Sequence, residues 1–77
     1  MSKYRVAVTL QRSLDQDEIQ QLHASRSESI TSYQMDGSDV VLVDLHSPTS
    51  LAAVETAEIQ VQRSTHVAIK ATQLISQ

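Results

Sequence analysis

The stretch that decides the fold is VVLVDLHSPTS, residues 40–50. Aliphatic side chains occupy both alternating sets of positions over residues 40–45, apart from Asp44, so the pattern predicts a strand at the centre of a sheet. Ser47 and Pro48 follow as an N-cap residue and a proline at the first helical position, which predicts a helix directly afterwards. The same stretch places Asp44, His46 and Ser47 close together, the residue types of a catalytic triad.

On the N-terminal side of this strand, residues 29–35 (SITSYQM) are rich in residues that favour strands. Asp36-Gly37 then favours a two-residue hairpin turn, so the two strands are expected to pair antiparallel. On the C-terminal side, the helix is expected through residues 49–58. Residues 58–62 (EIQVQ) alternate with period two, so they either end this helix or form a short extra strand. The last strand is predicted over residues 65–75.

The first third of the chain predicts one strand and one helix. Apolar and polar residues alternate over Tyr4–Leu10, as in a half-buried strand. A helix is expected from about Leu14 to Ser25 because Ser13 and Gln16 match a capping box. Three acidic residues in the first turn suit the positive end of the helix dipole. They are Asp15, Asp17 and Glu18.

Length and composition bound the class of protein. The 77 residues are expected to form a single domain, 1–77, and such a small domain gains stability from dimerisation. The sequence has no Phe, Trp or Cys, so the core must be aliphatic, and disulfides, thiolate chemistry and Cys-based metal sites are excluded. A net charge of −3 disfavours a nucleic-acid partner. The longest aliphatic run, Val40–Val43, is too short to span a membrane, and we expect a cytoplasmic protein.

The predicted order strand-helix-strand-strand-helix-strand resembles the ferredoxin-like domains over nearly the whole chain. This resemblance implies an α+β fold with a four-stranded antiparallel sheet, its first and third strands adjacent in the middle, and both helices on one face. The fold hosts many unrelated activities. The third strand has none of the central-strand aromatics of RNA-recognition domains, and the first has only Tyr4 at its edge. The sequence also lacks the paired Cys of metallochaperones and the Gly-rich loop of acylphosphatases. It also lacks the corresponding Gly of ACT-type regulatory domains.

On this topology the Asp-His-Ser group separates. Val41, Val43 and Leu45 are uniformly apolar and are expected to face the helices. Asp44 and His46 are then expected on the open face of the sheet, where Asp44 meets Arg5 or Lys3 in an ion pair. Ser47 points to the other face and caps the second helix, so no catalytic residues are predicted here. An enzyme that uses Asp44 and His46 is the third hypothesis, and nucleic-acid binding ranks below it. His23 approaches the same end of the sheet, but the sheet separates it from the other two, so neither a metal nor another cofactor is predicted.

The open face of the sheet is the predicted interaction site. Small aliphatic residues are expected at its centre with polar and charged residues around them, which is typical of a contact surface. The central residues are Ala7, Val40, Leu42 and Ala68. The surrounding residues are Arg5, Thr9, Asp44, His46, Lys70 and Thr72.

The favoured function is therefore a small non-enzymatic interaction or regulatory domain. It binds a partner protein or associates with itself as a homodimer, in the manner of bacterial or phage accessory or inhibitor proteins. The alternative is a small-molecule-sensing regulatory domain with its ligand site at a dimer interface. Neither hypothesis includes a membrane partner.

Overall fold

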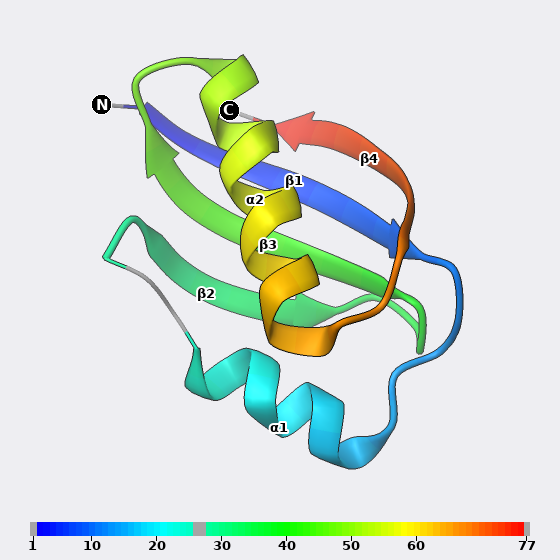
Figure 1. Ribbon diagram of the computed structural model, residues 1–77. Coiled ribbons are helices and arrows are strands. Elements are labelled where there is room, and N and C mark those ends of the chain that lie inside the picture. Colours follow the sequence, from blue (N-terminus) through cyan, green and yellow to red (C-terminus); the bar gives the residue numbers. More distant parts are fainter. Residues whose placement is uncertain (1, 26–27, 77) are drawn as a thin grey trace.

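The computed structural model describes residues 2–25 and 28–76 and has the predicted element order. The elements are β1 (Ser2–Leu10), α1 (Gln16–Ala24), β2 (Ile30–Met35), β3 (Val40–Ser47), α2 (Ser50–Thr65) and β4 (Ile69–Ser76). The strands form one antiparallel sheet in the order β2-β3-β1-β4. Both helices lie on one face of this sheet (Figure 1), so the α+β ferredoxin-like fold is confirmed.

The pairing of β1 with β3 builds the centre of the core. Tyr4 is opposite Leu45, and Val6 is opposite Val43 in the same ladder. Paired residues of an antiparallel ladder point to the same face, which here is the helix side. Both valines are fully buried. The aliphatic set predicted to face the helices, Val41, Val43 and Leu45, is confirmed.

Helix α2 is longer than predicted. Ala53, Ala57 and Val61 are fully buried at a spacing of four, so the stripe that faces the sheet continues to the end of the helix. The alternative of an extra strand over residues 58–62 is wrong. The side chain of Ile59 is 54% exposed, whereas that of Val61 is fully buried. The two residues therefore lie on different sides of one helix, although their spacing in the sequence resembles that of a strand.

The N-cap of α1 is Asp15 and not Ser13. The Asp15 carboxylate accepts a hydrogen bond from the Glu18 backbone N–H at 2.8 Å, and the Glu18 carboxylate accepts one from the Asp15 N–H at 3.0 Å. Both Ser13/Gln16 and Asp15/Glu18 fit a capping box in the sequence. Leu14 decides between them, because it is buried at the position before the cap, where a hydrophobic staple with Ile19 is expected.

Two further boundaries differ from the prediction. Ser47 belongs to β3 and is buried, so Thr49 caps α2 and its hydroxyl accepts from the Ala52 N–H at 3.1 Å. The connection between β2 and β3 spans residues 36–39 instead of a two-residue turn. Its one glycine, Gly37, has φ 91°, a left-handed conformation that favours this residue.

The attachment of α1 to the core generates a first prediction. Leu22 is the fully buried side chain of this helix. Replacing Leu22 by Ala leaves a cavity and should lower the free energy of unfolding by about 2–5 kcal/mol, measured by urea denaturation. Gln21→Ala, on the exposed side of the same helix, is the matched control and should change it by less than about 0.5 kcal/mol. Equal effects of the two substitutions would contradict the packing of α1.

Candidate interaction surfaces

The open face of the sheet gathers most of the predicted interaction residues. The β1–β3 register pairs Arg5 with Asp44, Ala7 with Leu42, and Thr9 with Val40, so these six share one face as expected. Ala7 is 9% exposed, and Val40 and Leu42 are half-buried. A row across all four strands reads Gln34, Leu42, Ala7 and Gln73. The aliphatic centre of the face is therefore small and flanked by amides.

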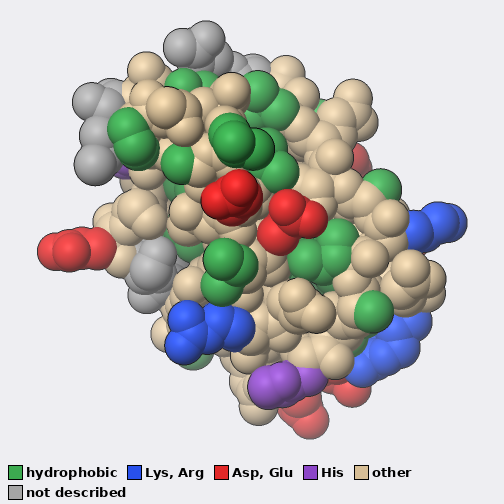
Figure 2. All heavy atoms as spheres, turned by 45° about the horizontal axis from the view of Figure 1, so that its top comes forward, with side chains coloured by type: hydrophobic (Ala, Val, Ile, Leu, Met, Phe, Trp, Pro, Cys, Tyr) green, Lys and Arg blue, Asp and Glu red, His purple; other side chains and the backbone are tan. Residues whose placement is uncertain are grey.

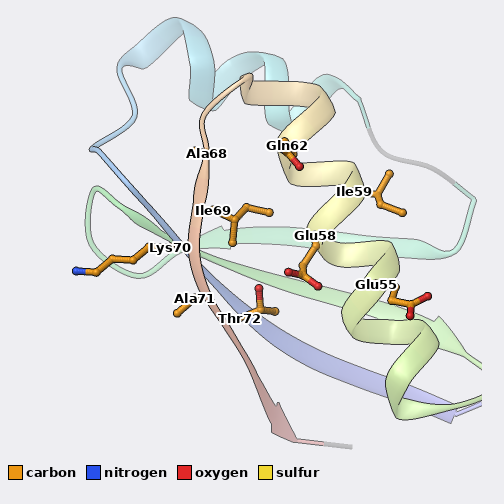
Figure 3. Close-up of a pocket in the computed structure, with 9 residues that line it drawn as sticks. All are labelled: Glu55, Glu58, Ile59, Gln62, Ala68, Ile69, Lys70, Ala71 and Thr72. Atoms are coloured by element: carbon orange, nitrogen blue, oxygen red, sulfur yellow. The ribbon is translucent and has the colours of Figure 1, made fainter.

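Of the residues predicted from the last strand (Ala68, Lys70 and Thr72), only Lys70 points to the open face of the sheet (Figure 3). Thr9 pairs with Ala71 and Leu10 with Ile69, so Lys70 is an extra residue in a β-bulge. Figure 3 shows Lys70 and Ala71 pointing away from α2, and Ile69 and Thr72 pointing towards it.

The placement of Thr72 on the open face is therefore wrong, and Ala71 and Gln73 lie there instead. Ala68 precedes β4 and is not part of the ladder, so its placement at the centre is also wrong. The bulge is the cause for Thr72, because one extra residue shifts the alternation of every residue that follows it. Ala68 is outside the ladder because α2 runs to Thr65 and β4 begins only at Ile69.

The predicted partner of Asp44 is confirmed as Arg5. The Arg5 Nε donates to Asp44 Oδ1 at 2.7 Å, and Nη2 donates to Oδ2 at 3.0 Å. The Ser32 hydroxyl also donates to Oδ2, at 3.0 Å. Hydrogen bonds from Arg5, followed by that from Ser32, hold the pKa of the Asp44 carboxyl below its ordinary value, although partial burial opposes this shift. Asp44 is thus part of a network that joins β2, β3 and β1.

The other polar candidates do not assemble into a catalytic or metal site. Ser47 is 3% exposed, and its hydroxyl donates to the Thr49 carbonyl at 3.0 Å. His46 is exposed and is paired with Lys3 across the ladder. His23 makes an edge-to-face contact with Tyr33, with 6.3 Å between the ring centroids. Within residues 2–25 and 28–76, no group of three or more His, Cys, Asp or Glu side chains is placed to hold a metal ion.

A second surface, which sequence reasoning missed, lies on α2 and β4. In the described part of the chain, the exposed large hydrophobic side chains are Leu51 (68%), Ile59 (54%), Ile75 (49%) and Leu74 (38%). In Figure 1, α2 lies in front of β1 and β3, α1 lies on the β2 side, and β4 forms the opposite edge. We call this surface the α2–β4 face. It consists of Leu51, Glu55, Glu58, Ile59, Gln62, Arg63, Ile69, Thr72 and Leu74.

A groove of about 500 Å³ runs between α2 and β4. Glu55, Glu58 and Ile59 line it from the helix, and Ile69 and Thr72 line it from the strand. The Glu58 carboxylate and the Thr72 hydroxyl point into the same gap (Figure 3). The buried Thr72 Oγ1 has no hydrogen-bond partner among the described atoms. Figure 2, viewed from the side of α2, shows hydrophobic side chains gathered around a pair of acidic ones.

A second hollow, of about 400 Å³, lies at the C-terminal end of α2. It is lined by Ile59, Gln62, Arg63 and His66. His66 ends the helix in the left-handed conformation, with φ 58°, and its side chain is exposed. The exposed Ile59 therefore borders a hollow on each of its two sides.

The charged side chains of the α2–β4 face belong to no ion pair within the described part of the chain. In the part of the chain that the structure describes, the ion pairs are Arg5–Asp44 and Arg12–Glu18. The second pair, with a backbone hydrogen bond from Asp15, lowers the pKa of Glu18 to about 2. Glu55, Glu58 and Arg63 take part in neither pair. These three charges are available to a binding partner.

Comparisons with known proteins add no functional information. No family model, no curated protein and no solved structure matches this chain. Among the described residues, no helix has the length and apolar character that crossing a membrane requires.

The Arg5–Asp44 network generates a pH-dependent prediction. Because folding lowers the pKa of Asp44, its contribution to stability is present above the ordinary value of 3.8 and is lost as pH falls through the folded-state value. Asp44→Asn should therefore destabilise the protein at neutral pH, with a difference from wild type that disappears in acid. Urea denaturation of both proteins from pH ~7 to pH ~2 measures this. A difference that does not change with pH would contradict the ion pair.

Proposed function

We propose that the protein is a small, non-enzymatic interaction domain of the cytoplasm that binds another protein chain through the α2–β4 face. The observation that carries this proposal is the placement of the exposed large aliphatic side chains. Of the four such side chains within residues 2–25 and 28–76, Leu51, Ile59 and Leu74 belong to this face. Scattered exposed aliphatic residues need no explanation, but a group on one surface is typical of a binding site.

The physical chemistry of this face supports protein binding. Full burial of a Leu or Ile side chain contributes about 1.5–3 kcal/mol, so Leu51 and Ile59 together offer a substantial hydrophobic gain to a partner. The charged groups between and beside them, Glu55, Glu58 and Arg63, would select the partner by charge complementarity. Most binding sites for small molecules enclose their ligand. This groove lies open on the surface and carries two carboxylates, so it fits a protein partner better than a small ligand.

The open face of the sheet offers less apolar surface and fewer unpaired charges to a protein partner. Its central residue Ala7 is already covered, and the charges of Arg5 and Asp44 satisfy each other within the chain. A partner would therefore gain little apolar burial there. Binding through this face stays a prediction, and so does the small-molecule-sensing alternative.

Two matched substitutions decide between the faces. The native chain is immobilised, and partner proteins are captured from the source cells by wild type, Ile59→Asp and Leu42→Asp. We expect Ile59→Asp to weaken capture by at least about tenfold, because it places a charge where an aliphatic anchor is buried. Leu42→Asp should leave capture within about twofold.

The opposite pattern would move the binding site to the open face of the sheet. Capture that neither substitution changes would overturn the proposed function. Circular dichroism of each variant confirms that it is folded.

A further inference from the structure

The outer ridge of α2 has a self-complementary order of side chains. Leu51, Glu55, Ile59 and Arg63 follow one another at a spacing of four and are all exposed. Such an i, i+4 series forms one of the ridges through which helices pack against each other. Along this ridge, Glu55 precedes Ile59 by one turn and Arg63 follows it by one turn. Ile59 is thus flanked by one negative and one positive charge.

From this arrangement we propose that the chain which occupies the α2–β4 face is a second copy of this protein. The α2 helices of the two copies cross antiparallel, with a two-fold axis at Ile59. Antiparallel crossing at that residue places Ile59 against Ile59 of the other copy, and Glu55 of each copy against Arg63 of the other. This inference rests on the proposed function, since it names the partner for the same face.

The charges favour this arrangement over a parallel one. A parallel crossing would place Glu55 against Glu55 and Arg63 against Arg63, which is repulsive. In the antiparallel crossing both residues gain an oppositely charged neighbour, which neither has in the described part of the chain. A two-fold interface uses the same patch on both copies, so each attractive contact occurs twice.

The shape of the face also fits a second copy. Leu51 lies two turns before Ile59. In the antiparallel crossing it therefore lies opposite the C-terminal end of the other copy's α2. The hollow of about 400 Å³ between Gln62, Arg63 and His66 lies at that end. Leu51, the most exposed of the large hydrophobic side chains described, would be received there. Each copy therefore supplies both the protruding side chain and the hollow that accepts it.

The outer edge of β4 is a poorer contact site than α2. Its register against β1 shifts near both ends, between Thr9 and Leu10 and between Arg5 and Val6. Bulges of this kind twist an edge and hinder pairing with another strand. A crossing of single helices buries a small area, so we expect a dissociation constant on the order of micromolar.

A charge exchange across the axis tests the proposal. Sedimentation equilibrium of the full chain gives the dimer dissociation constant for wild type, Glu55→Arg, Arg63→Glu and the double variant. Each single substitution places like charges against each other and should weaken the dimer at least about tenfold. The double variant restores opposite charges and should return to within about threefold of wild type. Glu28→Arg, an exposed site outside the α2–β4 face, changes the net charge equally to Glu55→Arg and should have little effect.

The outcomes separate this inference from the proposed function. Wild type that is monomeric up to about millimolar concentration, or a double variant that stays as weak as the single ones, overturns the two-fold crossing. If wild type is monomeric while Ile59→Asp still abolishes capture of a cellular protein, the proposed function stands with a different partner. If wild type is monomeric and capture is insensitive to Ile59→Asp, both are overturned.

Discussion

The antiparallel pairing of β1 with β3 is the constraint on which the rest of the structure depends. These strands occupy the two central positions of the sheet, so their register determines where β2 and β4 can pair. A slip of β1 by one residue against β3 would turn Val6 from the core to the open face while Val43 stays in the core. The hydrogen-bonded pair Arg5–Asp44 lies directly opposite in the same ladder and is satisfied in this register. Hydrophobic burial on one face and charge pairing on the other thus select one alignment.

A core without Phe or Trp also shapes the helix layer. Ala53 and Ala57 face the sheet from α2, and small side chains at these positions let the helix approach the central valines closely. The helix therefore covers β1 and β3, while α1 lies on the β2 side (Figure 1). The consequence is that the outer flank of α2 and the neighbouring part of β4 keep aliphatic side chains exposed.

The two faces differ in how many of their charged and apolar side chains already have partners within the chain. On the open face, Arg5, Asp44 and Ser32 bind one another, and Ala7 is covered by its neighbours. On the α2–β4 face, Leu51 and Ile59 are exposed, and Glu55 and Arg63 belong to neither ion pair of the described part of the chain. Association is driven by groups whose interactions are incomplete in the free chain. This difference, more than the presence of any one residue type, directs attention to α2.

The sequence by itself determined the element order, the residues that face the helices, and a basic partner from β1 for Asp44. The resemblance of this element order to ferredoxin-like domains implied the central position of β1 and β3. These features follow from periodicity and topology, which the order of residues contains. The tertiary structure alone decided which capping box is used, because that depends on the burial of Leu14 in the core. It also decided the bulge that exchanges Thr72 for Ala71 on the open face, and the exposure of Leu51 and Ile59. Bulges and uncovered flanks arise from how distant elements pack together, and no local pattern of residues specifies that.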